Sequence, residues 1–184
     1  NLSGVGVITG LAWTPLGGAT LSIEASRVHQ LTRGFKLTGQ LGDVMRESAE
    51  IAYSYVIGRH KEFGFAADYF EKAFIHLHVP AGATPKDGPS AGITMASALV
   101  SLARRRRVRE RIGMTGELTL TGQVLAVGGI REKIIAAKRQ GIREVILPEA
   151  NRSDYEQLLA HIRTDMTAHF VVRYEQVYPL IFRR

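Results

Sequence analysis

Ser90 lies at the junction between a loop rich in proline and glycine and a long apolar segment. Three of the six prolines fall within residues 80–89, and this stretch cannot form a regular element, because proline lacks a backbone donor and restricts the residue before it. From Ser90 to about Arg107 the sequence predicts a largely buried helix. Unpaired N–H groups and the positive dipole end of such a helix could form an oxyanion hole, whereas a purely structural Ser90 would cap the helix.

A serine nucleophile needs a base, and Lys133 is the candidate that the sequence offers. A helix is predicted from Gly128-Gly129 to Gln140, and its spacing places Lys133 on the same face as Ile130 and Ile134. A lysine among apolar groups loses hydration of its ammonium form, so its pKa falls and the neutral amine can accept a proton. The alternative is a lysine whose stem covers apolar surface while its amine reaches solvent.

A second arrangement around Ser90 is also possible. Gly88-Pro-Ser-Ala-Gly92 matches the G-x-S-x-G nucleophile elbow, in which an acid and then a histidine follow in the chain, here Asp154 with His161 or His169. The elbow must be fed directly by a strand, which residues 80–89 cannot form. A Ser-His-Asp hydrolase is therefore kept as an alternative.

His76 and His78 lie on one face of a predicted strand, a spacing that can bind zinc. No third and fourth ligands stand out, so we interpret the pair as structural histidines and predict no metal site. The chain has no phosphate-binding G-x-x-x-x-G-K-[ST] motif, and we predict no nucleotide site in it.

The elements that must position Ser90 and Lys133 are mixed strands and helices. Alternation on both sides of Pro15 and Gly17-Gly18 predicts a β-hairpin over residues 5–25, with Trp13 at its shoulder, and helical periodicity predicts a helix over 39–60. Further strands are predicted at 75–79, 114–120, 123–127, 144–147 and 170–172, with a helix from the capping box 153–156 through Ile162 and a short terminal helix. No repeat or linker divides the chain, so we predict one α+β domain over 1–184.

Composition restricts the chemistry further. The 184 residues are 45% hydrophobic, and no apolar run approaches the roughly 18–20 residues that cross a bilayer, so no membrane partner is expected. The absence of cysteine excludes disulfides, thiolate metal sites and a cysteine nucleophile, and it fits a reducing compartment. The first residue is not methionine, which suggests a piece of a longer protein.

The charge balance is basic, with 24 lysines and arginines against 17 acidic residues and a net charge of +7. The excess is concentrated in Arg104–Arg107, with Arg109 and Arg111 close behind. A basic run of this kind is either a solvated helix end or a nucleic-acid contact, so a nucleic-acid-binding module is the alternative from a different functional class.

Several motifs in the same order resemble the C-terminal proteolytic domain of Lon proteases, of the form that carries its ATPase in the same chain. The resemblance covers nearly all 184 positions. It rests on Pro85-Lys-Asp-Gly-Pro-Ser-Ala-Gly92, Met114-Thr-Gly-Glu117 and Gly128-Gly-Ile-Arg-Glu-Lys133, and also on His76-Leu-His-Val-Pro-Ala-Gly-Ala-Thr84 and Gly10-Leu-Ala-Trp-Thr14.

The resemblance implies a role for each matching residue. Ser90 would be the nucleophile and Lys133 the general base of a serine endopeptidase, with no catalytic histidine. Thr115 would position the lysine, and Asp87 would be the acidic residue of the serine loop, whose conformation governs assembly of the dyad. Trp13 would lie near the groove for the substrate strand.

The resemblance also implies a fold and partners. The fold would resemble domain 2 of ribosomal protein S5, and the full protein would be a homo-hexameric ring in the cytoplasm or the mitochondrial matrix. Its substrates would be unfolded, misfolded and regulatory proteins, and DNA binding is possible, as in relatives. ATP and Mg²⁺ would belong to an AAA+ ATPase module outside this chain, and this domain itself would need no cofactor.

Overall fold

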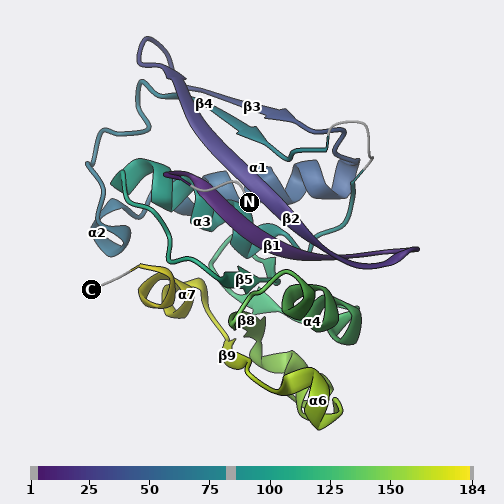
Figure 1. Cartoon of the computed structure of the whole chain (residues 1–184). Helices are drawn as coiled ribbons and strands as arrows, with labels where there is room; N and C mark the ends of the chain where they lie inside the picture. Colours follow the sequence, from purple (N-terminus) through teal and green to yellow (C-terminus); the bar gives the residue numbers. More distant parts are fainter. Residues whose placement is uncertain (1–3, 82–85, 183–184) are drawn as a thin grey trace.

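This computed structural model describes residues 4–81 and 86–182. At its centre lies a mixed seven-stranded sheet with the strand order β3-β4-β2-β1-β5-β8-β9 (Figure 1). Its strands are β1 (Val7–Thr14), β2 (Gly17–His29), β3 (Gly34–Thr38), β4 (Phe74–His78), β5 (Ile112–Met114), β8 (Glu144–Pro148) and β9 (Thr167–Val171). A separate two-stranded sheet pairs β6 (Glu117–Leu118) with β7 (Val124–Leu125). Pro85 of the serine loop and its neighbours 82–84 lie outside the described residues.

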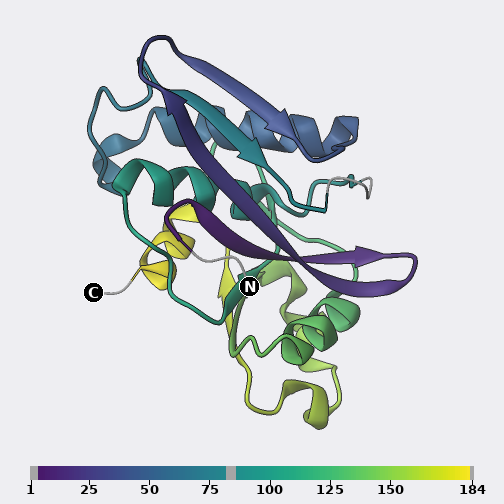
Figure 2. The same cartoon turned by 45° about the horizontal axis from the view of Figure 1, so that its top comes forward.

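The predicted hairpin at the N-terminus is confirmed. β1 and β2 pair antiparallel from Val7 opposite Glu24 to Thr14 opposite Gly17, and the Thr14 hydroxyl closes the turn by donating to the Gly17 carbonyl at 3.0 Å. β1 also pairs in parallel with β5, through Gly10 and Met114. The outer half of the hairpin therefore projects beyond the shared pairing with β5 (Figure 2).

Helices pack on both faces of this sheet. The helical elements are α1 (Asp43–Ile57), α2 (His60–Phe63), α3 (Gly92–Arg104), α4 (Ile130–Arg139), the 3-10 turn η1 (Glu149–Asn151), α5 (Arg152–Glu156), α6 (Ala160–Arg163) and α7 (Tyr174–Ile181). α1 and α3 pack against each other on one face, while α4 packs against the hairpin (Figure 1). In the described part of the chain, no helix has the length and apolar character needed to cross a membrane.

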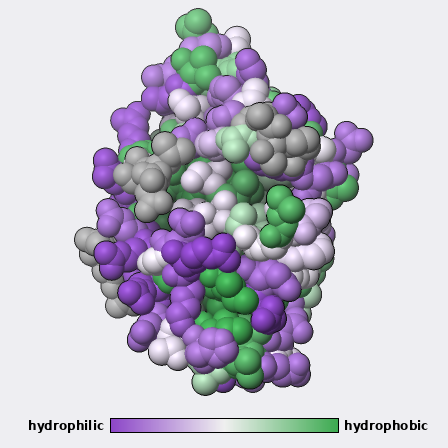
Figure 3. Space-filling view, turned by 45° about the vertical axis from the view of Figure 1, so that its right-hand side comes forward, coloured by the Kyte–Doolittle hydropathy of each residue, from purple (hydrophilic) through white to green (hydrophobic). Residues whose placement is uncertain are grey.

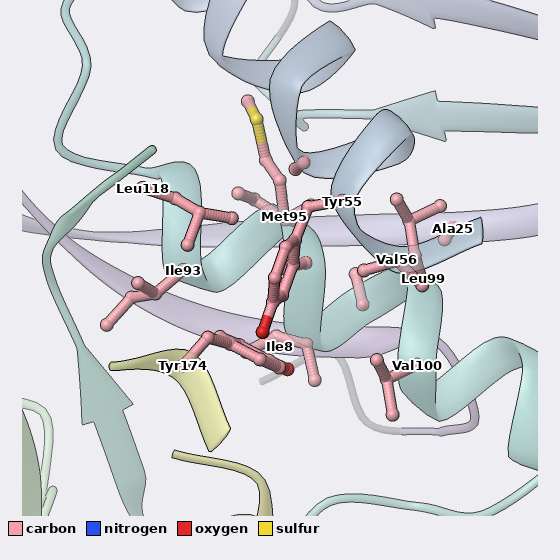
Figure 4. Packing of buried hydrophobic residues seen from close by; sticks show 14 of the residues in the cluster. Ile8, Ala25, Tyr55, Val56, Ile93, Met95, Leu99, Val100, Leu118 and Tyr174 are labelled. Atoms are coloured by element: carbon pink, nitrogen blue, oxygen red, sulfur yellow. The ribbon is translucent and has the colours of Figure 1, made fainter. Parts of the chain in front are cut away.

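Two hydrophobic cores lie on opposite faces of β1. The larger core lies between α1, α3 and the sheet, where Ile8, Tyr55, Met95 and Leu99 are all but inaccessible (Figure 4). Leu11 points to the other face, because it lies an odd number of residues from Ile8. There it joins the second core, whose other buried members are Ile130, Ile134, Ala137, Ile142, Val145, Leu147, Tyr155 and Ile162.

The mixed α+β class is thus confirmed, and so are the helices expected near 39–60, 90–107 and 129–140. The expected strand 114–120 is interrupted after Met114, because Thr115 N donates to the Ile146 carbonyl and Gly116 N donates to the Ser90 carbonyl. β3 and α2 were not predicted from the sequence.

The helix expected from the capping box at 153–156 through Ile162 is wrong in two respects. It is divided into α5 and α6, and α5 already begins at Arg152 without a side-chain cap. The residues of the box use their side chains elsewhere, since the Ser153 hydroxyl accepts from Gln157 Nε2 at 3.0 Å and Glu156 pairs with Arg152 at 3.5 Å.

Candidate active site

Ser90 lies just before α3 and is held from the β5 side. Its carbonyl accepts a hydrogen bond from Gly116 N at 2.9 Å, and Ile93 N returns a bond to the Gly116 carbonyl at 3.2 Å. Only glycine fits at position 92, because a Cβ there would lie 2.7 Å from Leu118 N. The N-cap of α3 is Ala91, so the capping interpretation of Ser90 is wrong. The serine is left at the surface of this junction, half-buried.

Lys133 lies in the first turn of α4 and is buried. Its side chain is 2% exposed, so the interpretation of a lysine that reaches solvent is wrong. Nζ donates to Thr115 Oγ1 at 3.0 Å, and burial lowers the pKa of Lys133 from 10.5 to about 8. At pH 7 about one molecule in ten then carries a neutral amine, against fewer than one in a thousand for an exposed lysine.

Thr115 connects the lysine to the serine segment. Its hydroxyl is fully buried, accepts a hydrogen bond from Lys133 Nζ and donates its own to the Ser90 carbonyl at 3.4 Å. The strand pairing of Met114 with Ile146 brings Thr115 to this place, and Thr115 N continues the ladder by donating to the Ile146 carbonyl. The structure therefore brings Ser90, Thr115 and Lys133 together, from three different elements.

Asp87 is exposed and turned toward α1. Its Oδ1 accepts from Met45 N at 2.9 Å, and bonds from the backbone N–H groups of Met45, Gly88 and Val44 hold the pKa of Asp87 below its usual 3.8. α1 has Gly42 at its N-cap, so Asp87 supplies the capping oxygen that this position lacks. A Cβ on Gly42 would lie 2.3 Å from Asp87 Cγ.

Sequence reasoning missed this partner of Asp87. A helix that begins at glycine, with no capping side chain of its own, was the available signal. The same contact includes Lys86, whose N donates to the Gln40 carbonyl at 3.0 Å and whose carbonyl accepts from Gly42 N at 2.7 Å. The segment before Ser90 is thus tied to the start of α1.

Trp13 lies beside the start of the helix that carries Lys133. A Cβ on Gly129 would lie 2.8 Å from Trp13 Cβ, and a Cβ on Gly18 would lie 1.9 Å from the Glu132 carbonyl, so glycines let α4 rest directly on the hairpin. Trp13 is 58% exposed and Leu16 at the turn is fully exposed. Figure 3 shows apolar side chains among polar ones on the side of the molecule that carries this hairpin tip. The role of Trp13 beside a substrate groove stays a prediction, and sequence reasoning missed the two glycines.

The Ser-His-Asp alternative is not assembled. His169 Nε2 contacts Glu144 Oε2 at 3.0 Å on the β8–β9 side of the sheet, and Asp154 Oδ2 accepts from the Asn151 side chain. His161 lies on α6, where its carbonyl accepts a bond from Lys138. Neither histidine pairs with Asp154 in the described residues.

The other candidate ligands have structural partners. His76 Nε2 and His78 Nδ1 each lie 2.7 Å from the Thr38 hydroxyl, and the pKa of His76 is lowered, mainly by burial. Across 4–81 and 86–182, no three His, Asp or Glu side chains gather as a metal site would require.

The arginine run divides between internal contacts and exposed surface. Arg104 lies over the rings of Tyr178 and Phe182, at 5.0 and 4.5 Å from their centres. Arg109 forms a two-pronged ion pair with Glu144, at 2.8 and 2.7 Å. Arg105 and Arg107 are exposed, and Arg107 lines a groove between residues 107–112 and the β1–β2 hairpin.

Comparison with known proteins gives a consistent result. Residues 1–184 match the family described as the Lon protease (S16) C-terminal proteolytic domain. Lon protease 2 of Hydrogenovibrio crunogenus is 61% identical over 97% of this chain and 20% of its own length. Lon protease 1 of Syntrophotalea carbinolica is 59% identical over 96% of this chain and 22% of its own length, and Lon protease of Magnetococcus marinus is 58% identical over 98% and 22%.

The chain therefore spans about a fifth of the length of the curated relatives it matches. The resemblance seen in the sequence motifs is confirmed, because the match extends over every residue and the most similar of these relatives share well over half of their aligned positions. The chain belongs to the Lon protease C-terminal proteolytic domain family.

Proposed function

We propose that this chain is a serine endopeptidase domain that works through a dyad of Ser90 and Lys133. One observation carries the proposal: a lysine that is 2% exposed, with its pKa lowered to about 8, is held by a hydroxyl that also contacts the serine residue. Among the described residues, burial is the cause of this lowered pKa, and it keeps part of the Lys133 population neutral. A base with a pKa near the working pH is effective in general acid-base catalysis.

The first half of the reaction forms an acyl-enzyme. Neutral Lys133 takes the hydroxyl proton as Ser90 Oγ attacks the peptide carbonyl carbon, and the carbonyl oxygen becomes an oxyanion. Gly92 N and Ile93 N already donate to the Pro89 and Gly116 carbonyls. Among the described contacts, the N–H groups of Ser90 and Ala91 are left to receive the oxyanion at the positive end of α3.

The second half of the reaction restores the enzyme. The Lys133 ammonium returns its proton to the leaving amine as the C–N bond breaks, and the amine departs as the new N-terminus. The neutral lysine then takes a proton from water as the water oxygen attacks the ester carbon. When the ester C–O bond breaks, the Lys133 ammonium returns that proton to Ser90 Oγ, and the acid product is released. Thr115 accepts one N–H of Lys133 in each of these steps and thereby keeps the amine at a fixed place.

The substrate is an extended segment of polypeptide. Leu11–Thr14 of β1 continue beyond the residue at which β1 pairs with β5, which leaves main-chain groups beside the site that can pair with an added strand. Recognition through main-chain bonds selects weakly for sequence. Trp13, exposed on this segment, offers an apolar surface to substrate side chains.

The full-length protein would add the work that this domain cannot perform. The relatives are named Lon proteases and are about five times as long as this chain. We infer that an AAA+ ATPase module of the same chain unfolds proteins with ATP and Mg²⁺ and delivers them to a homo-hexameric ring of proteolytic domains. Cleavage of an unstructured peptide by this chain alone should then be independent of ATP.

A serine-directed fluorophosphonate tests the dyad. The chain should be labelled at Ser90, and Ser90→Ala should abolish labelling. Lys133→Met should reduce labelling to a similar extent while the fold is retained, as for groups that act as a unit. Labelling that persists in Lys133→Met, or that is lost on replacement of His161 or His169, would show that another base serves Ser90.

A further inference from the structure

Asn151 is a buried amide side chain that the mechanism above does not use. It is 2% exposed and lies at the end of η1, between β8 and α5. Buried amides need hydrogen-bond partners, and two of the three bonds of Asn151 go to a residue that lies 24 positions earlier in the chain. Val127 N donates to Asn151 Oδ1 at 2.9 Å, and Asn151 Nδ2 donates to the Val127 carbonyl at 2.9 Å. One side chain thus binds both polar groups of one backbone residue, as a neighbouring strand would.

A third bond fixes the orientation of the Asn151 amide. Nδ2 also donates to Asp154 Oδ2 at 2.8 Å. Because an ionised carboxylate only accepts, the amide nitrogen must face Asp154, which turns the amide oxygen toward Val127 N. The nearby carboxylates Glu149 and Glu156 pair with Arg152, whereas Asp154 accepts from the amide.

Asn151 binds the backbone of Val127 three residues before the first residue of the helix that carries Lys133. The next two residues are Gly128 and Gly129, which restrict the backbone least. Gly129 is the N-cap of α4, with a left-handed φ of 71° and no side-chain cap. Lys133 N donates to the Gly129 carbonyl at 2.9 Å, so the lysine is placed one turn from this entry point. The position of its amine depends on where the chain enters α4.

We propose that Asn151 is a positioning residue for peptide cleavage, whose amide clamps Val127 and so fixes the entry of α4 that keeps Lys133 against Thr115. This inference rests on the proposed dyad of Ser90 and Lys133. When the clamp is absent, the two glycines let the first turn of α4 move. The amine then loses its alignment with the Thr115 hydroxyl and gains access to water.

Asn151→Ala tests the clamp without adding a charge. With a fluorogenic peptide, kcat should fall by about 10- to 100-fold, the usual effect of a displacement near 1 Å, while KM stays within about twofold. The midpoint of the pH-rate profile should move upward from about 8 toward 10.5, because a hydrated lysine regains its ordinary pKa. Hydrogen exchange at the Val127 amide should become faster. Asp154→Ala is a milder variant and should shift the same three quantities in the same direction.

Ile162→Ala is the matched control. Ile162 is buried in the same small core, and its apolar side chain cannot bind the backbone N–H and C=O groups of Val127, so its truncation should lower stability without moving the pH midpoint. An Asn151→Ala protein with the parent kcat and midpoint, or a midpoint shift of equal size in Ile162→Ala, would overturn the positioning role. If either of these results is found but Lys133→Met abolishes fluorophosphonate labelling of Ser90, the dyad stands and only the clamp fails. If Lys133→Met is still labelled, the proposed function itself fails.

Discussion

Replacing Lys133 with methionine should abolish peptidase activity and stabilise the fold at the same time. In the unfolded chain the lysine has a pKa of 10.5, and burial lowers this to about 8 in the folded state. The folded state therefore binds the proton more weakly, and below pH 8 the buried ammonium destabilises folding. The shift corresponds to about 3 kcal/mol. A methionine of similar length carries no proton and removes this penalty.

The pH dependence gives the prediction its sign. Between pH 8 and 10.5 the unfolded chain holds a proton that the folded chain has released, so the stability of the parent protein rises with pH through this window. The gain from Lys133→Met should be full below pH 8 and should vanish above about 10.5. A gain of about 3 kcal/mol corresponds to a Tm increase of roughly 6–12 °C for a chain of this length.

Urea unfolding at pH 7, 8.5 and 10, followed by circular dichroism, measures this difference directly. Lys61→Met on α2 is the control, because Lys61 is exposed and its replacement should change stability little at any of these pH values. A Lys133→Met protein that is no more stable than the parent at pH 7, or a difference that is constant from pH 7 to 10, would refute the argument from burial.

Three further changes test other parts of the site. Thr115→Val removes the acceptor of Lys133 Nζ, and a hydrogen bond to a charged group contributes about 1.5–3 kcal/mol. The midpoint of the pH-rate profile should therefore fall by about one to two pH units, and the plateau rate should drop. The midpoint shift is opposite in direction to the one expected for Asn151→Ala. Gly42→Ala places a methyl group against the Asp87 carboxylate, so it should reduce fluorophosphonate labelling of Ser90 while Tm changes little. Gly58→Ala, at the other end of α1, is the control and should leave labelling unchanged, because a Cβ there meets no neighbour. Equal labelling of the two variants would show that the serine segment does not depend on the contact with α1. Changing Arg105 and Arg107 to Gln should leave peptide cleavage unchanged. If these arginines bind DNA, the change should reduce the salt dependence of DNA affinity, measured by titration, by up to about one unit of slope per lost phosphate contact. An unchanged slope would show that they are a solvated helix end.

Local patterns predicted the elements whose partners are near in sequence. The hairpin of β1 and β2 and the helices α1, α3 and α4 follow from periodicity and turn residues alone. β3 was missed because its five residues pair with β4, which lies 40 positions further along the chain. The division of α5 from α6 was missed because Ser153 and Glu156 match a capping box but bond to Gln157 and Arg152 instead.

The site shows the same division between local and distant signals. Helical spacing was enough to place Lys133 on an apolar face, and the loop at 80–89 was enough to single out Ser90. The link between them through Thr115 depends on the parallel pairing of β5 with β8, and nothing in either local segment encodes it. The contact of Asp87 with α1 and the clamp of Asn151 on Val127 are long-range in the same way.

The two proposed catalytic groups are attached to different cores. Ser90 precedes α3, which is part of the larger core, whereas Lys133 lies on α4, whose Ile130 and Ile134 belong to the smaller one. Lys133 is 2% exposed there, and this burial lowers its pKa. The bond from Lys133 to Thr115, at the end of β5, then spans the junction of the two cores. The alignment of base and nucleophile therefore depends on how firmly the backbone fixes α4 at its first turn.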